Sequence, residues 1–157
     1  MHETVCQKIE SSVLCWLATS SIDHHPNVSP KEIFTHYNND SIIIANIASP
    51  GSAKNINQNP YACVSFIDIF TQKGFKIAGR AMVLHPDDDG YQEMETLLIK
   101  MTAGKFPFQS IFRIMCDQVR PIIAPRYRLF PETTEHDQIR SAMETYGVRS
   151  TQEPPEG

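Results

Sequence analysis

The stretch that decides the fold is residues 45–55, ANIASPGSAKN, which follow a short apolar run. The pattern predicts a strand that leads into a short helix. Ser49 is suited to cap that helix, and Pro50 to its first turn, where a missing N–H loses no hydrogen bond. The bare helix N-terminus, with the hydroxyl of Ser52 and the cation of Lys54, favours a phosphate. The stretch therefore predicts a site for a phosphorylated ligand, and an ordinary capped helix is the alternative.

Length and composition point to one globular domain. The chain has 157 residues, of which 41% are hydrophobic and 20% charged, so residues 1–150 are expected to form one domain. Residues 151–157 are polar and rich in proline, and we expect them to be disordered. The net charge of -4 argues against nucleic acid as a partner. No apolar run approaches the roughly 20 residues that cross a bilayer, and no secretory signal is visible.

The spacing of cysteines and histidines predicts no metal site. Cys6, Cys15, Cys63 and Cys116 are far apart, and no pair of His or Cys residues has the spacing of zinc ligands. The four cysteines are typical of reduced thiols in a cytoplasmic protein. No Ser-His-Asp, Cys-His or paired-carboxylate arrangement can be assembled from the spacing, so the sequence names no catalytic residue.

The hydrophobic pattern predicts a mainly β, α+β fold. The continuous apolar run at 13–19 is expected to be buried on both faces, whereas residues 75–84 alternate so that one face is buried. Two short connections in succession imply an antiparallel meander, and the whole pattern implies a small barrel of five or six strands with peripheral helices. Strands are expected at 13–19, 27–37, 41–47, 62–69 and 75–84 and within 117–130, and helices at 3–12, after 49, at 87–101 and at 134–146.

Two of these helices carry specific expectations about packing. In the helix at 87–101 the three leading aspartates are interpreted as a solvated first turn. Its apolar positions are interpreted as core, namely Tyr91, Met94, Leu97, Leu98 and Met101. The last helix is expected to bury Ile139, Met143 and Tyr146. In the strand between them, Pro121 and Pro125 suit a sheet edge.

A second segment, residues 27–34, also has the composition of a ligand site. On an extended strand Ser29 and Lys31 face one way, while Val28 and Pro30 face the other. Because proline removes a backbone donor, the strand is expected to lie at an edge or to be locally broken there. Backbone groups freed in this way can pair with a planar heterocycle. The alternative is a surface edge strand whose lysine is solvated.

Taken in order, these segments resemble the pyridoxamine 5'-phosphate oxidase-like family of flavin-binding split-barrel proteins. The resemblance covers about residues 5 to 85, and the stretch at 119–148 looks like an extension found in a subgroup. The matching pattern is Leu17-Ala18-Thr19, Pro26-x-Val28-Ser29-Pro30-Lys31, Ser52-x-Lys54 with Asn59-Pro60, and Gly79-Arg80-Ala81.

The resemblance implies a six-stranded antiparallel split barrel with short helices, a homodimer, and FMN bound in the dimer interface. It also implies that the backbone around Lys31 contacts the flavin ring and that Ser52 and Lys54 hold the FMN phosphate. Replacing Lys54 by alanine is then expected to cost about 1.5–3 kcal/mol of binding. The cofactor-binding residues predicted in this way are Val28, Ser29, Pro30, Lys31, Asn46, Ser49, Ser52, Lys54 and Asn55.

The chain departs from the family pattern in three places. Ala53 stands where an arginine is often found, and Gly74 where a glutamine is common. Their contacts would fall to groups such as Lys73 or Arg80. The segment rich in Trp and Arg that grips pyridoxamine has no counterpart, since the only tryptophan is Trp16. The sequence therefore argues against pyridoxamine phosphate as the substrate.

Three functions are open at this point. The first is a small FMN-dependent oxidoreductase of unknown substrate, in which the flavin carries the electrons. Phe106, Phe108 and Tyr127 would then line an apolar cleft above the ring, or else serve only as core. The second is a non-catalytic flavin or haem binder that acts as a sensor or carrier. The third is a cofactor-free dimeric scaffold.

Overall fold

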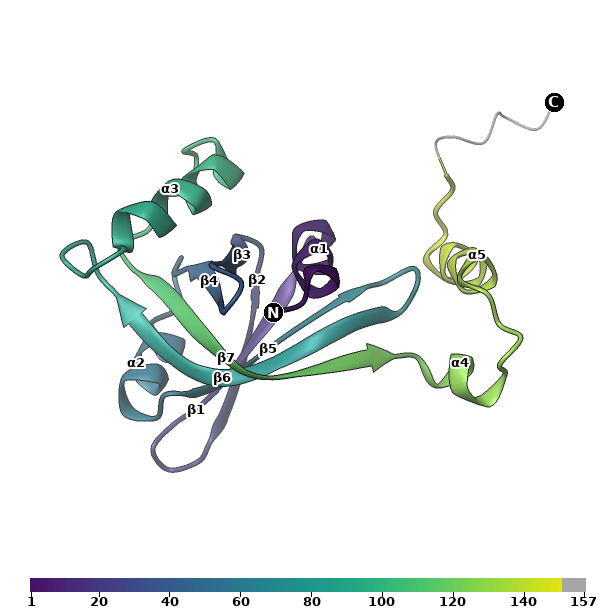
Figure 1. Ribbon diagram of the computed structural model, residues 1–157, viewed down its shortest axis with the longest axis horizontal. Helices are drawn as coiled ribbons and strands as arrows, with labels where there is room; N and C mark the ends of the chain where they lie inside the picture. Colours follow the sequence, from purple (N-terminus) through teal and green to yellow (C-terminus); the bar gives the residue numbers. More distant parts are fainter. Residues whose placement is uncertain (151–157) are drawn as a thin grey trace.

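The computed structural model describes residues 1–150, in which seven antiparallel strands form one sheet that curls into a half-barrel (Figure 1). The strand order is β2-β1-β5-β6-β7-β4-β3. The strands are β1 (Cys15–Ser20), β2 (Pro26–Lys31), β3 (Phe34–Tyr37), β4 (Ser41–Ala45), β5 (Tyr61–Asp68), β6 (Lys73–Leu84) and β7 (Ile111–Ile123). The helices are α1 (Glu3–Ser11), α2 (Pro50–Gln58), α3 (Tyr91–Thr102), α4 (Pro125–Leu129) and α5 (Glu135–Tyr146).

The predicted α+β class is confirmed, but the predicted count of six strands is wrong because the strand expected at 27–37 is two strands. β2 ends at Lys31, opposite Cys15 of β1, and β3 begins at Phe34. These two strands lie at opposite ends of the strand order, so the expected meander holds within β1–β2 and within β3–β4 but not between them. β2 and β3 do not pair with each other, so the sheet stays open between these two strands and the barrel is split there. Pro30 lies on an edge strand, as predicted.

The strand that is buried on both faces is β4, whereas β1 is buried on one face only. β1 alternates, with Leu17 fully buried and Trp16 45% exposed, so the prediction for 13–19 is wrong. Every residue of β4 is buried, because Ile42 and Ile44 pack in the barrel core while Ile43 packs beneath α3. The alternation predicted for β6 is confirmed. The apolar runs that form β1 and β4 look alike in sequence. They differ in burial because α3 covers the second face of β4 and not that of β1.

The helix predicted at 87–101 begins later than expected, at Tyr91. The aspartates before it form a turn, in which a carboxylate oxygen of Asp88 accepts a hydrogen bond from the backbone N–H of His85 at 2.7 Å. Tyr91, Met94 and Leu98 are buried, whereas Leu97 and Met101 are exposed, so the predicted core face is only partly correct.

The C-terminal part of the chain extends away from the barrel (Figure 1). β7 starts earlier than predicted and pairs with β4 only as far as Met115, which leaves Pro121 on an open edge, as expected. Pro125 begins α4 and is not in a strand. α5 has the predicted range, but it buries Gln138 and Ala142 and not the predicted trio of Ile139, Met143 and Tyr146. The disorder predicted for 151–157 lies outside the described residues.

The start of α5 gives a local stability prediction. The Thr134 side chain accepts a hydrogen bond from the N–H of Asp137 at 3.1 Å, and the Asp137 carboxylate accepts one from the N–H of Thr134 at 3.1 Å. Replacing Thr134 by alanine removes half of this capping box and is expected to cost about 1 kcal/mol of helix stability. Amide hydrogen exchange should then speed up several-fold in α5 and stay unchanged in β6. Unchanged exchange in α5 would show that the box is not needed.

Candidate functional site

The two segments singled out in the sequence meet at a surface cavity of about 420 Å³, here called the Lys31 cavity. β2 contributes Ser29 and Lys31, and the loop after β4 contributes Ala48 and Ser49. Phe106, from the segment between α3 and β7, lines the same cavity. Residues distant in sequence thus converge where the barrel is split.

Lys31 is the one charged side chain within residues 1–150 that is buried, with 7% of its surface exposed. Its ammonium group donates a hydrogen bond to the hydroxyl of Ser49 and lies 5.9 Å from the centroid of the Phe112 ring. No carboxylate in the described part of the chain forms a salt bridge with it. Burial lowers the pKa of Lys31. Lys31 is therefore a cation without a direct ion-pair partner, although the exposed Glu32 lines the same cavity.

The N-terminus of α2 adjoins this cation. Ser49 occupies the N-cap position and Pro50 the first turn, as predicted, but the Ser49 side chain forms no capping hydrogen bond. Its hydroxyl is engaged by Lys31 and by the carbonyl of Ile47 at 3.4 Å. Among the described residues no acceptor bonds the backbone N–H groups of Gly51 and Ser52. Unbonded N–H groups at the positive end of a helix dipole favour an anion.

Ser52 faces the barrel, where a polar network joins α2 to the β1–β2 hairpin. Its hydroxyl accepts a hydrogen bond from the Asn27 side chain at 3.2 Å and lies 3.3 Å from the hydroxyl of Ser29. The amide nitrogens of Asn27 and Asn55 both donate to the Thr19 hydroxyl, at 3.2 and 3.1 Å. The network fixes the helix N-terminus relative to β2. The sequence interpretation included Ser29, Ser52 and Asn55 but missed the other two.

A signal for the missed residues was available. Asn27 lies on the same strand face as Ser29 and Lys31, because side chains two apart on a strand point the same way. Thr19 is paired directly with Asn27 in the hairpin register. Because every second residue of a strand faces the same way, Asn27 could have been added to the predicted site with Ser29 and Lys31, and Thr19 with its hairpin partner Asn27.

Other predicted residues lie away from the Lys31 cavity. Val28 and Pro30 point to the outer face of the sheet, although Pro30 still lines the cavity rim. Lys54 is exposed on α2 and lines none of the cavities around this loop. Tyr127 is remote, and its hydroxyl donates to the carbonyl of Thr71 at 2.8 Å. Arg80 stacks on Tyr61 outside the barrel.

A larger cavity, of about 850 Å³, lies on the other side of the same loop and is called here the Tyr91 cavity. The two cavities share Ile47, Ala48 and Ser49. Ala48 has a left-handed backbone, with φ of 53°, which is uncommon for alanine and marks a constrained loop. Asn46 and Phe108 line this cavity and not the Lys31 cavity, so the structure divides the predicted residues between two compartments.

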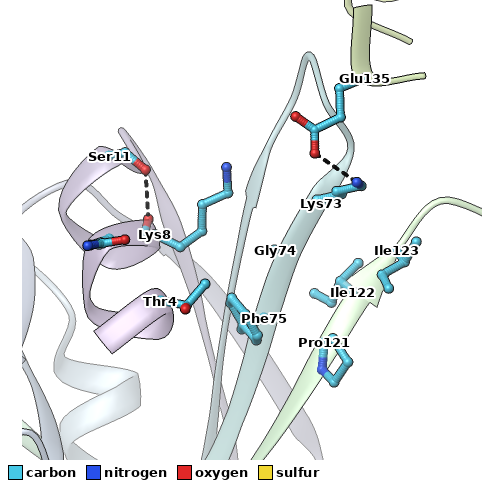
Figure 2. Close-up of a pocket in the computed structure, with 11 residues that line it drawn as sticks. Thr4, Lys8, Ser11, Lys73, Gly74, Phe75, Pro121, Ile122, Ile123 and Glu135 are labelled. Carbon is cyan, nitrogen blue, oxygen red and sulfur yellow. Dashed lines mark hydrogen bonds and ion pairs between the residues drawn. The ribbon is translucent and has the colours of Figure 1, made fainter. Parts of the chain in front are cut away.

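A third cavity, of about 530 Å³, lies between α1 and the β6–β7 ribbon and contains none of the predicted cofactor-binding residues (Figure 2). Its floor is apolar, with Phe75 and Ile122, and we call it the α1 cavity. Two lysines stand at its rim, but Lys8 forms an ion pair with Asp68 at 3.2 Å and Lys73 one with Glu135 at 2.8 Å. Both cations are neutralised here, in contrast to Lys31.

The remaining sequence expectations concern metals, thiols and membranes. No group of three or more metal-binding side chains is found in the described residues. The four cysteines are free, and burial raises the pKa of Cys15 to about 12, which keeps its thiol protonated and unreactive. Within residues 1–150 no helix has both the length and the apolar character needed to cross a membrane.

Solved structures of several proteins share this fold. HupZ from Group A Streptococcus aligns with a TM-score of 0.65 and 18% identity, over 76% of this chain and 91% of that chain. An FMN-binding protein from Syntrophomonas wolfei aligns with a TM-score of 0.64 and 12% identity, over 78% and 86%. HutZ, the haem storage protein from Vibrio cholerae, aligns with a TM-score of 0.61 and 16% identity, over 74% and 89%. At these identities the likeness concerns the fold alone. No curated protein matches the sequence.

A sequence family gives the stronger assignment. The family model described as pyridoxamine 5'-phosphate oxidase matches residues 1–123. That range runs from the N-terminus to the end of β7 and includes the split barrel, α2 and both cavities beside its N-terminal loop. The resemblance inferred from the sequence motifs is thereby confirmed. The chain belongs to the pyridoxamine 5'-phosphate oxidase family of split-barrel proteins.

Proposed function

We propose that this protein is an FMN-binding flavoprotein whose cofactor phosphate binds beside Lys31 at the N-terminus of α2. The observation that carries the proposal is the buried ammonium group of Lys31, which has a neutral hydroxyl and no carboxylate as its partner. A buried charge is costly unless it is paired, so the position favours an anionic ligand. A phosphate monoester carries nearly two negative charges and would also accept hydrogen bonds from the free N–H groups of α2.

The flavin ring would lie along the exposed edge of β2. This strand pairs with β1 on one side only, so backbone groups of its other edge are available to the polar edge of a heterocycle. Ser29 and Phe106 line the same cavity and supply a polar and an apolar contact. A bound FMN would supply one- and two-electron transfer, while the protein would bind it, orient it and exclude water.

A homodimer fits the outer face of the sheet. By strand register Trp16 of β1 lies beside Pro30 of β2, and Ala18 beside Val28. Trp16, Val28 and Tyr61 are all exposed there, which makes an apolar surface next to the Lys31 cavity. Apolar surfaces of this kind are commonly covered by a partner. We propose a second copy of the chain, which would also complete the flavin pocket from the other side.

We favour an oxidoreductase over a passive carrier, and a substrate other than pyridoxamine phosphate. An oxidoreductase needs room for a substrate beside its cofactor. The Tyr91 cavity adjoins the Lys31 cavity through a shared loop and offers that room. The four free thiols fit a cytoplasmic location, where cysteines stay reduced.

The spectrum of the purified protein tests the proposal first. We expect absorbance typical of an oxidised flavin, and mass spectrometry of the released chromophore should identify FMN. A Soret band would instead favour the haem-binding alternative, and a colourless protein that does not take up FMN would support the cofactor-free scaffold. Anaerobic bleaching by NADH or NADPH, followed by reoxidation with a defined acceptor, would distinguish an oxidoreductase from a passive binder.

Lys54 provides a second test of the phosphate position. It lies in the first turns of α2 and is exposed, so it can reach an anion at the helix N-terminus only from the solvent side. We expect Lys54→Ala to weaken FMN binding by about 1.5 kcal/mol, or roughly tenfold, with a strong dependence on ionic strength. Fluorescence titration at low and high salt would measure this. Unchanged affinity at low salt would contradict a role for Lys54.

A further inference from the structure

Two residues, Asn46 and Ser110, fasten the loop after β4 to the start of β7. The backbone N–H of Asn46 donates a hydrogen bond to the carbonyl of Ser110 at 3.0 Å, and the Asn46 side-chain amide donates one to the Ser110 hydroxyl at 2.9 Å. Ser110 is buried, with 6% of its surface exposed. Two hydrogen bonds between the same residues fix both the position and the orientation of Asn46. We call this pair the Asn46–Ser110 clamp.

The clamp lies where the loop leaves the sheet. Ala45 is the last residue of β4 and pairs with Ile111 of β7, so Asn46 continues this ladder by one residue. The chain then turns sharply, because the N–H of Ile47 donates to the carbonyl of Ala45 at 3.1 Å and Ala48 has a left-handed backbone. The clamp therefore sets the direction in which the loop leaves β4.

Three residues after the clamp, Ser49 reaches the proposed phosphate site. Its hydroxyl accepts a hydrogen bond from the ammonium group of Lys31, and α2 follows directly. Within residues 1–150 this is the one hydrogen bond that links residues 47–49 to β2 or to β7. Asn46 is therefore the nearest fixed point from which the loop places Ser49 against Lys31.

The clamp also joins two walls of the Lys31 cavity. Ser49 lines the cavity from the loop after β4, and Phe106 lines it from the segment between α3 and β7. That segment ends at Ser110, the residue before β7. The hydrogen bonds between Asn46 and Ser110 therefore hold the two walls in a fixed relation to each other.

The side chain of Asn46 does not face the proposed phosphate site, since it lines the Tyr91 cavity and not the Lys31 cavity. Its oxygen is enclosed and has no hydrogen-bond partner within residues 1–150, while its nitrogen donates to Ser110. This arrangement favours an action through the loop over a direct contact with the phosphate.

We infer that Asn46 and Ser110 are positioning residues that make the site selective for FMN over riboflavin; the inference rests on the proposed function. The FMN phosphate needs the Ser49 hydroxyl, the Lys31 ammonium group and the first N–H groups of α2 in one arrangement, and a displacement of the loop by about 1 Å would misalign them. Riboflavin lacks the phosphate and does not use this arrangement. Loosening the clamp therefore weakens the binding of FMN and leaves that of riboflavin unchanged.

Ser110→Ala tests the inference in the full-length protein, because it removes the hydroxyl and leaves the backbone hydrogen bond. We expect FMN affinity to fall about fivefold and riboflavin affinity to change less than about twofold, both measured by fluorescence titration. Asn46→Ala removes the other partner of the same hydrogen bond, so the double variant should lose no more than the weaker-binding single variant. Losses that multiply in the double variant would show that the two residues do not act as a pair, and would overturn the inference.

Tyr127→Phe is the matched control. It removes a hydroxyl that donates to the carbonyl of Thr71 at 2.8 Å and that lies away from the Lys31 cavity. The ratio of the FMN and riboflavin affinities should change by less than about twofold. A loss of selectivity equal to that of Ser110→Ala would show a general loosening of the protein and would overturn the clamp.

A second cycle tests whether the clamp acts through Lys31. In a Lys31→Met background, Ser110→Ala should lower FMN affinity less than about twofold, because the ammonium group that the clamp aligns is gone. An equal loss in both backgrounds would overturn the inference. Parallel losses of FMN and riboflavin binding in Ser110→Ala would do the same, since a purely structural role predicts them.

Failure of the clamp and failure of the proposed function give different results. If the wild-type protein prefers FMN and Ser110→Ala keeps the full preference, the phosphate position stands and the clamp is wrong. If the wild-type protein binds FMN and riboflavin equally, the phosphate position is contradicted and the clamp falls with it. Thermal unfolding confirms that each variant is folded.

Discussion

Replacing Lys31 by methionine is expected to weaken FMN binding by about 2–3 kcal/mol, or roughly 30- to 150-fold. The substitution keeps the length and apolar stem of the side chain but removes the ammonium group that would face the phosphate. A charge-assisted hydrogen bond in a cavity that is partly closed to water is worth more than one at the surface. The loss should therefore exceed that of Lys54→Ala, whose charge is exposed. Fluorescence titration with FMN measures both.

The same substitution is expected to stabilise the protein without its ligand. Lys31 is buried, and its lowered pKa indicates that the folded state disfavours its charge. Removing this charge should raise the free energy of unfolding by about 1–2 kcal/mol. For a domain of this size that corresponds to a rise in Tm of about 2–8 °C. A residue that lowers stability when the site is empty and raises affinity when it is filled is typical of a binding site.

Lys100→Met is the matched control for both effects. Lys100 is exposed in the last turn of α3, outside the cavities described above, so its loss should change FMN affinity less than twofold and Tm by about 1 °C or less. If Lys31→Met were destabilising and left FMN affinity unchanged, Lys31 would be a structural residue and the phosphate position would be wrong.

The second large effect is expected at Gly79, where β6 and β7 form an irregular pair. The register shifts between Ala78 and Gly79, so that Asp117 is the extra residue of a bulge. A Cβ atom at Gly79 would overlap the backbone carbonyl of Met115, which cannot move without breaking the ladder. We expect Gly79→Ala to lower the free energy of unfolding by about 2–4 kcal/mol and Tm by about 5–15 °C.

Gly51→Ala serves as the comparison for Gly79→Ala in stability measurements. No atom lies within 4 Å of a Cβ placed at Gly51, and the residue is helical, so alanine should be neutral or stabilising by up to about 1 kcal/mol. Chemical denaturation of both variants provides the measurement. Similar stabilities for the two would mean that the strand contact at Gly79 relaxes more readily than its backbone neighbours suggest.

Local features of the sequence predicted the fold well where the signal was short-range. Pro50 begins α2 as expected, the alternation of β6 identified its buried face, and Pro30 indicated an edge. The errors arose where tertiary contacts decide. Whether Trp16 or Ile43 is covered depends on where α3 packs, and no local pattern contains that information.

In the candidate site, too, local sequence signals predicted some residues correctly, while tertiary contacts decided the others. The helix signal predicted an anion site at Ser49, and the resemblance placed Lys31 beside the flavin ring. The structure brings the two side chains together. Lys54, predicted both from its place near the helix N-terminus and from the resemblance, lies outside the cavity in the single chain, and its predicted contact with phosphate stays a prediction. Tyr91 was interpreted as core on an amphipathic helix, and the structure buries it. That it also lines a cavity beside the loop after β4 becomes visible only when that loop and the segment before β7 are in place.

The most direct test compares FMN with riboflavin, which lacks only the phosphate. If the phosphate binds beside Lys31 and the N-terminus of α2, FMN should bind the wild-type protein at least 100-fold more tightly than riboflavin, and most of this preference should disappear in Lys31→Met. Equal affinities for the two compounds in the wild-type protein would contradict the account.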